Sequence, residues 1–406
     1  MQPAASIRVL SPFRAIMILV VLLLAAHAPL FLNDSVFMDD WLALKLRPDY
    51  PVEIDFLIHG AGHPVLFGYY SIANMTGAPV LVMKAMAIAA ILSGAISLFL
   101  VATRTGLLSR AEAVGVALLA WTYPGYQVWA GKAISIYVFS LGLFFVGLWL
   151  LTLAFNARGL SHFALRIAAV LVFFFSFALN SIMVLYAFAM LGLFVAVWRG
   201  NDRVRGSVLR LASSAWGCAS RYPEFVVLPL VYWGALNIWF KRVGAYASYY
   251  AIHLPTISEL RSGWNAFFQM GCMNVLARAG ETASNHWFLF VLIGAVVIVA
   301  FLLRAKDRLP RTPAFEITLP FVLSVLLFLA LSMPYLIAGI QPTLAFHETR
   351  HLLLFGLPGA LLVMAAKRLV QRAIGDRAAL VGVLVWRSSC RPRHSGTATC
   401  SCRPEC

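Results

Sequence analysis

Long apolar runs alternate with short polar stretches from one end of the chain to the other. A helix needs about 20 mostly apolar residues to cross a bilayer, and about ten runs approach that length. The pattern predicts an all-α protein, a polytopic transmembrane helical bundle of about 10 to 11 helices. The expected crossings are Ala15–Leu32, Pro79–Val101, Ala111–Trp121 with its flanks, Ala133–Phe155, Phe163–Leu179, Ile182–Trp198, Phe225–Phe240, Trp287–Leu303, Ile317–Ile337 and His351–Ala366.

Lys and Arg collect in every second polar stretch, which predicts the sidedness of the bundle. Arg8 and Arg14 precede the first run, and Lys and Arg in cytoplasmic loops set the orientation of membrane proteins. We therefore expect a multi-pass protein of a bacterial inner membrane with a cytoplasmic N-terminus. The first run resembles a signal peptide, but no small-residue cleavage site follows it, so we predict an uncleaved first helix.

The composition supports a membrane protein, and it changes how the positive net charge is interpreted. The chain of 406 residues is 61% hydrophobic and 12% charged, with a formal net charge of +16. Soluble domains are nearer half apolar and a quarter charged. The positive charge is explained by basic loops facing anionic lipid, and no basic patch interleaved with aromatics indicates nucleic acid as a partner.

The runs define one transmembrane domain, residues 1–386, and a polar tail, residues 387–406. The domain contains a first extracytoplasmic loop at 33–63 and a longer one at 241–286. The apolar run at 378–386 is too short to span a bilayer. The tail holds four of the six cysteines and is either disordered or the product of a frameshift that cut into an eleventh helix.

The first outer loop carries the strongest chemical signal, the acidic pair Asp39 and Asp40. The loop holds 6 of the 16 acidic residues in an otherwise apolar chain. A carboxylate there can accept a proton from an attacking hydroxyl. Adjacent residues point to different sides of a helix or strand, so one acid would face a substrate while the other caps the next helix. The alternative is a solvated loop whose acids have only a topological role.

His59 and His63 lie four residues apart in the same loop, with Asp55 at the same spacing before them. On a helix these side chains would share a face and could bind a divalent metal ion. The intervening glycines disfavour a helix, so we predict no dedicated metal site and leave a metal cofactor open.

Two further polar groups fall on the predicted outer side. Lys132 lies in the turn near Tyr126, and Glu348, Arg350 and His351 stand where the last complete run begins. Arginine can form two parallel hydrogen bonds to a phosphate. The alternatives are a lysine that snorkels to the interface and a cluster that only anchors the helix end.

Three short motifs give the chain a resemblance to a known family. Met38-Asp39-Asp40-Trp41, Gly62-His63-Pro64 and Thr349-Arg350-His351-Leu352 occur in the order and topological positions seen in the GT-C superfamily. These integral-membrane glycosyltransferases use sugars linked to lipid phosphates, and they include protein mannosyltransferases and aminoarabinose transferases. Many members have more helices or a soluble C-terminal domain, and we expect neither within these 406 residues.

The resemblance implies a GT-C-like fold and a reaction. Asp39 or Asp40 would deprotonate an acceptor hydroxyl, while Arg350, with Lys132 or His351, would hold the departing polyprenyl phosphate. His63 and Glu348 complete the expected substrate-binding set. The expected partners are a lipid-linked sugar donor, membrane lipid, and a glycan, lipid or protein acceptor.

Two other classes of protein remain as alternatives. A transporter or flippase of lipid-linked glycans would place ionisable residues deep in the helices, and Lys84 is the main residue of that kind. A non-catalytic assembly subunit would need no cluster of acids and cations outside.

Overall fold

The computed structural model describes residues 11–32, 40–45, 55, 58, 64–106, 108–126, 131–179, 182–199, 217, 219–240, 254–286, 314–340, 342–343, 346–370 and 372. Within these residues all regular structure is helical. Five of the described helical segments are long and apolar enough to cross a membrane, and they identify the chain as a helical membrane protein. These segments are Pro79–Arg104, Ser135–Ala154, Gly159–Ser176, Thr318–Ile337 and Thr349–Val370.

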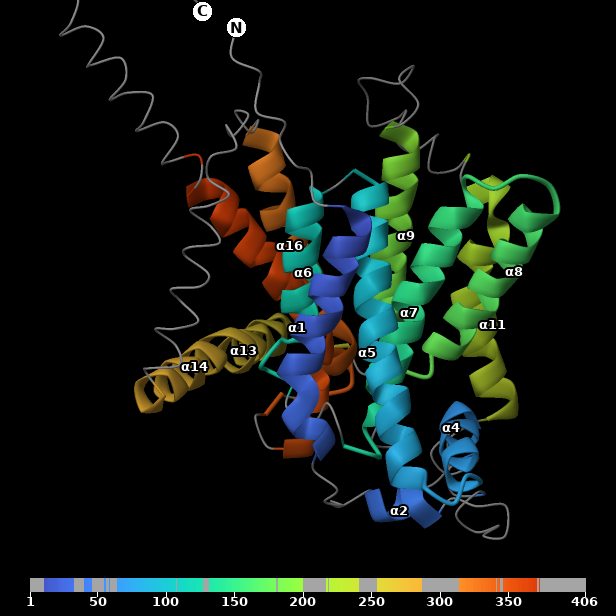
Figure 1. Ribbon diagram of the computed structural model, residues 1–406, viewed down its shortest axis with the longest axis horizontal. Helices are drawn as coiled ribbons and strands as arrows, with labels where there is room; N and C mark the ends of the chain where they lie inside the picture. Colours follow the sequence, from blue (N-terminus) through green and yellow to red (C-terminus); the bar gives the residue numbers. More distant parts are fainter. Residues whose placement is uncertain are drawn as a thin grey trace, which may run out of the picture.

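Most helices run roughly parallel in one bundle, with two short helices at one end and a pair lying across it (Figure 1). In chain order they are α1 Pro12–Leu32, α2 Asp40–Lys45, α4 Pro64–Asn74, α5 Pro79–Arg104, α6 Arg110–Trp121, α7 Ser135–Ala154, α8 Gly159–Ser176, α9 Ile182–Arg199, α11 Pro223–Trp239, α13 Ile257–Phe268, the π-helix η2 Gln269–Met273, α14 Asn274–Asn285, α16 Ala314–Ile337 and the 3₁₀-helix η3 Phe346–Phe355. An α-helical segment at residues 356–370 continues directly from η3.

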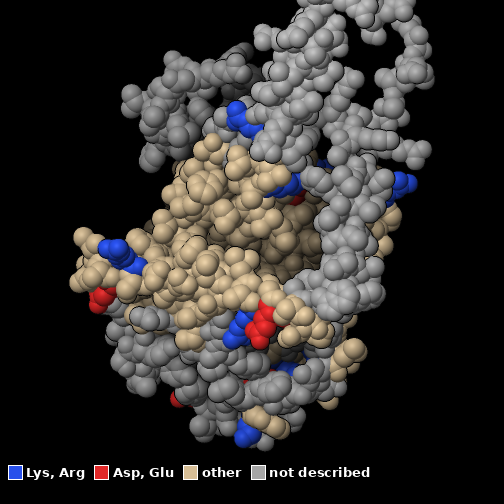
Figure 2. Space-filling view, turned by 90° about the vertical axis from the view of Figure 1, so that its left-hand side faces the viewer, with Lys and Arg blue, Asp and Glu red and all other residues tan. Residues whose placement is uncertain are grey.

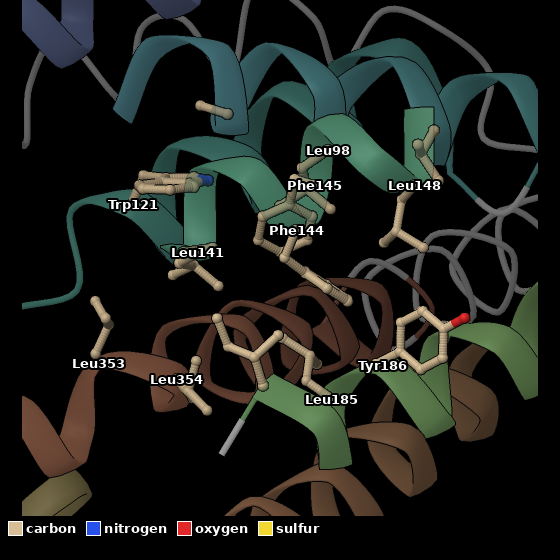
Figure 3. Packing of buried hydrophobic residues seen from close by; sticks show 14 of the residues in the cluster. Leu98, Trp121, Leu141, Phe144, Phe145, Leu148, Leu185, Tyr186, Leu353 and Leu354 are labelled. Carbon is tan, nitrogen blue, oxygen red and sulfur yellow. The ribbon is translucent and has the colours of Figure 1, made fainter. Parts of the chain in front are cut away.

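The centre of the bundle is the contact between α5 and α7, where small residues allow the helices to approach closely. A Cβ atom added to Gly142 would lie 2.7 Å from the backbone oxygen of Ala90, and one added to Gly94 would lie 3.0 Å from the Cα of Gly142. Close approach through glycine and alanine is a common way for helices to pack within a membrane. The core continues from α5 and α7 to α9 and to η3, where Leu353 and Leu354 lie (Figure 3).

The start of α6 is fixed by a capping box and an ion pair. The Ser109 hydroxyl accepts from the backbone N–H of Glu112, and the Glu112 carboxylate accepts from the backbone N–H of Ser109. Arg368 donates from Nε and Nη2 to the two carboxylate oxygens of Glu112, each at 2.9 Å. The pair joins α6 to the helical segment at residues 356–370.

The outside of the bundle is apolar. On α8, Leu160, Phe163, Ile167 and Leu171 are exposed, and on α11, Trp233, Ile238 and Trp239 are exposed. The side seen in Figure 2 is dominated by uncharged residues among those described, with isolated charged side chains. A large apolar exterior is what lipid contact requires.

The expected crossings that fall on described residues are helical, including the hairpin of α8 and α9. The expected crossing at Trp287–Leu303 and the tail at 387–406 lie outside the described residues. The stretch 241–286, which we expect to be a longer extracytoplasmic loop, contains α13, η2 and α14 at residues 257–285. The apolar residues of this stretch are spread over two sides of the helices, so no long hydrophobic run marks them.

Candidate functional site

The polar side chains that the sequence singles out meet at one end of the bundle. This is the end that carries α2 and α4, at the bottom of Figure 1, and we call it the α2/α4 end. Asp40 is 3% exposed and Lys132 is 2% exposed, although both are ionisable. Ionisable residues are rarely buried without partners or a function, so this end is the natural place to look for a site.

Asp40 joins the first polar loop to the turn before α7. It is the first residue of α2, and its Oδ1 accepts a hydrogen bond of 2.7 Å from the backbone N–H of Ala133. The Tyr70 hydroxyl donates to the carbonyl of the same Ala133 at 2.5 Å. Asn74 in turn donates to the carbonyl of Ala43 at 2.9 Å, which ties α4 to α2. The Asp40 carboxylate therefore lies beside Lys132, and one of its oxygens is already occupied by the backbone.

A second set of bonds continues from this point into α7. The Ser135 hydroxyl lies 2.6 Å from the carbonyl of Lys132, to which it donates, and 2.8 Å from the hydroxyl of Tyr69. Burial raises the pKa of Tyr69 to about 12, and the bond with Ser135 acts in the opposite direction. Tyr69 therefore stays protonated at neutral pH, and it donates to the Ser135 hydroxyl, whose own proton is directed at the carbonyl of Lys132.

Tyr126 links this end of the molecule to the C-terminal helices. Burial raises the pKa of its hydroxyl well above the ordinary value, Tyr137 adds to the rise, and the positive charge of Arg350 opposes it. Tyr69 also acts on the same hydroxyl. Electrostatic effects of this kind require the groups to lie near one another. Arg350, which is more than 200 positions away in the sequence, thus belongs to the same cluster as Tyr69 and Tyr126.

Arg350 is carried by η3, whose neighbouring side chains are packed tightly. Thr349 is fully buried and His351 is 6% exposed. The ring of His351 lies edge-on to Tyr335 at the end of α16, with centroids 4.9 Å apart. Phe355 stacks on Phe267 of α13 at 5.3 Å. These contacts set the position of η3, and Arg350 itself is only partly buried.

The structure brings three of the seven predicted site residues together. Asp40 and Lys132 lie at the α2/α4 end, and Arg350 lies near Tyr126. His351 follows Arg350 in η3 and contacts Tyr335 of α16. Asp39 and His63 lie outside the described residues, and Glu348 lies in η3 with a side chain that is not described. Their roles remain predictions.

Sequence reasoning missed the tyrosines of this cluster, since Tyr69, Tyr70 and Tyr126 are all buried. Lys84 of α5, which the sequence did single out, is 5% exposed. Tyrosines near helix ends have a ready explanation as interfacial residues, so the sequence does not single them out. The sequence places several tyrosines on both sides of Lys132. A buried hydroxyl normally needs a partner, so this concentration of tyrosines was the signal that could have indicated a hydrogen-bonded cluster.

The donor set for a metal ion is not assembled among the described side chains. Across the described ranges no three His, Cys, Asp or Glu residues gather closely enough to hold an ion. His59 and His63 lie outside those ranges, so the alternative that places a metal on them is still a prediction.

Comparison with known proteins gives no further assignment. No protein-family model, no curated protein and no solved structure matches this chain.

Proposed function

We propose that this protein is a membrane glycosyltransferase of the GT-C kind. It moves a sugar from a polyprenyl-phosphate-linked donor to an acceptor at the α2/α4 end, which faces the extracytoplasmic side of a bacterial inner membrane. The proposal is carried by one observation: an acidic loop residue, Asp40, and two cationic residues, Lys132 and Arg350, are assembled at the same end of the bundle. Acids and cations around one point suit a reaction in which a hydroxyl loses a proton and a phosphate departs.

Asp39 is the better candidate for the base, and Asp40 for a positioning residue. An oxygen of Asp40 already accepts the Ala133 amide, and the side chain is buried at the start of α2. Neighbouring residues in a helix or an extended segment point in different directions, so with Asp40 held by the backbone, Asp39 is the acid that we expect to face a substrate. Asp39 takes the proton of the acceptor hydroxyl, the hydroxyl oxygen bonds to the anomeric carbon, and the bond from that carbon to the phosphate oxygen breaks.

The departing polyprenyl phosphate carries the negative charge of the reaction. Arg350 can bind two of its oxygens at once, because the guanidinium group is planar and always charged. Lys132 provides a second positive charge from the other side of the cluster. Tyr126 stays protonated and can donate a hydrogen bond. His63, Glu348 and His351 complete the proposed substrate-binding set.

The test compares Asp39→Asn with Asp40→Asn in membranes. Both variants exchange one carboxylate for an amide, so each is a matched control for the other. The measurement is release of labelled polyprenyl phosphate from lipid-linked sugars, with equal amounts of folded protein. We expect Asp39→Asn to lower release by about 10²- to 10⁴-fold, because loss of a general base costs that much. We expect Asp40→Asn to retain activity, since the amide oxygen can still accept the Ala133 N–H.

The stability of alanine variants distinguishes the positioning role of Asp40 from the catalytic role of Asp39. Asp40→Ala removes the acceptor and leaves a buried amide unpaired, which costs about 1–3 kcal/mol of unfolding free energy. Thermal unfolding in detergent measures this loss, and Asp39→Ala should leave the midpoint unchanged. Normal turnover in both amide variants would contradict the role of Asp39 as the base, and absence of release by the native protein would contradict the enzyme proposal.

Lys84 is the observation that favours the second candidate, a transporter of lipid-linked glycans. It is buried in α5, within a segment that can span the membrane. Ionisable residues inside membrane segments often belong to substrate pathways. Movement of a fluorescent lipid-linked glycan across proteoliposomes that is lost in Lys84→Met, with no release of polyprenyl phosphate, would support this reading instead.

A further inference from the structure

The segment formed by α13, η2 and α14 lies across the bundle rather than along it. In Figure 1 these helices run roughly crosswise to α1 and α5, and α14 projects away from the other described helices. The segment begins with a capping box in which Thr256 and Glu259 satisfy each other's backbone amides. It therefore starts as a helix in its own right and not as an extension of a membrane-spanning helix.

The contacts of this segment place it at the level where membrane-spanning segments end. Gly263 lies so close to Leu336 that an added Cβ would be 2.2 Å from the leucine side chain. Leu336 is in the last turn of the span Thr318–Ile337. Phe267 contacts Tyr335 in that same turn and stacks on Phe355, which lies in the first part of the span Thr349–Val370. All of these partners stand near one boundary of the apolar layer.

The π-helix η2 reinforces this placement. Its wide turn contains Gly271, whose carbonyl accepts a 2.5 Å hydrogen bond from the Tyr123 hydroxyl. Tyr123 follows directly after α6, so it marks another helix end at the same level. A π-turn adds one residue to a helix and shifts the phase of every residue after it. Because of this shift, residues four positions apart, such as Gly263, Phe267 and Gly271, remain on the same side of the segment.

Three sides of the segment consequently differ in character. The side toward the bundle carries Gly263, Phe267 and Gly271, each buried. The next side is apolar and exposed: Ile257 is 87% exposed, Phe268 45% and Leu276 66%. The third side is polar and exposed, with Ser262, Asn265, Gln269 and Glu281.

We propose that α13, η2 and α14 lie in the plane of the membrane interface, with Ile257, Phe268 and Leu276 inserted among lipid acyl chains. A helix with separate apolar and polar sides binds a bilayer surface in this way. Lipid is the occupant that fits, because the segment is fixed at the ends of membrane-spanning helices while its free apolar side extends beyond the bundle. The positive charges of Arg261 and Arg278 are balanced in number by the negative charges of Glu259 and Glu281. Insertion is therefore driven by the apolar side chains and needs no anionic headgroup.

Photo-crosslinking tests the proposal in the full chain and in membranes. A benzophenone amino acid is introduced at position 268 or 276, and at the neighbouring positions 269 or 277 as matched controls. All four native side chains are exposed, so the replacements should be tolerated. In vesicles of zwitterionic phospholipid, we expect severalfold more lipid adduct, measured by mass spectrometry, at Phe268 and Leu276 than at Gln269 and Ala277.

Two results would overturn this placement. A crosslinked dimer at positions 268 and 276 would show that a second copy of the chain covers the apolar side. Equal, low lipid adduct at all four positions would show that the segment stands in water. Size-exclusion profiles in detergent verify folding, and the pair Ile257 and Ser258 replaces any pair whose variants fail that check. The outcome does not depend on the proposed glycosyl transfer.

Discussion

Tyr69 shows how burial of one residue makes stability depend on pH. Its hydroxyl is bonded to Ser135, and its pKa rises to about 12 from the ordinary value of 10.0, mainly through burial. In the unfolded chain the hydroxyl ionises near the ordinary value, so the unfolded state loses its proton first as the pH rises. The contribution of Tyr69 to stability is therefore complete below pH 10 and is lost progressively as the pH rises toward 12.

This gives a prediction for Tyr69→Phe. The native protein should lose unfolding free energy between pH 10 and pH 12 faster than the variant, by roughly 1.4 kcal/mol for each unit of pKa shift. The measurement is thermal or chemical unfolding in detergent at several pH values, with lysine titration common to both proteins. Parallel pH curves for the two proteins would contradict a buried, protonated Tyr69.

At the residue scale, the charged members of the site were predictable and the tyrosines were not. Asp40, Lys132, Arg350 and His351 stand out because ionisable residues are scarce in this chain. Tyr126 did not stand out, since tyrosine near a helix end has a ready explanation as an interfacial residue. Which of Asp39 and Asp40 is held by the backbone depends on the packing of α2 against the turn before α7, and no sequence pattern specifies that contact.

At the element scale, the α5–α7 contact depends on the absence of a side chain at Gly142. In Gly142→Ala the new Cβ would approach the Ala90 oxygen at 2.7 Å and the Ala90 Cα at 3.0 Å. Both are backbone atoms, so the two helices must separate. We expect a loss of about 1–3 kcal/mol of unfolding free energy, as for other overpacked contacts.

Gly192→Ala in α9 is the matched control, because nothing lies within 4 Å of a Cβ at that position. It should be neutral or slightly stabilising, since alanine favours a helix more than glycine does. Unfolding midpoints of the two variants in the same detergent measure the difference. Equal midpoints would show that α5 and α7 are not closely packed at Gly142.

The helices of the bundle followed from hydrophobic length, whereas α13 and α14 did not. Their apolar residues are shared between a side facing the bundle and an exposed side, and glycine supplies part of the buried side at Gly263 and Gly271. The one local signal was Thr256 followed three residues later by Glu259, which is typical of a helix start. That signal is short, and a search for long apolar runs passes over it.

At the scale of the whole molecule, the Glu112–Arg368 pair connects two halves of the bundle. Its side chains are only 13% and 10% exposed. Removal of one partner leaves a buried charge uncompensated, which costs roughly 3–5 kcal/mol. We predict that Glu112→Gln and Arg368→Gln each destabilise the protein strongly, and that the double variant loses much less than the sum of the two.

A double-mutant cycle of unfolding free energies measures this coupling. Arg166→Gln and Glu224→Gln supply a second cycle for comparison, because that pair is more exposed, at 20% and 29%, and joins only α8 to α11. The coupling should be smaller there. Additive losses for Glu112 and Arg368 would show that the pair does not connect the two halves.

The same pair has a consequence for the order in which the chain is made. Glu112 and Arg368 are 256 positions apart, and at about 5–20 residues per second the ribosome needs on the order of 10 to 50 s to reach the second after the first. Throughout that interval Glu112 depends on Ser109, whose N–H and hydroxyl are its local partners. The capping box thus accommodates the carboxylate during biosynthesis, and the arginine completes the assembly when the last helix arrives.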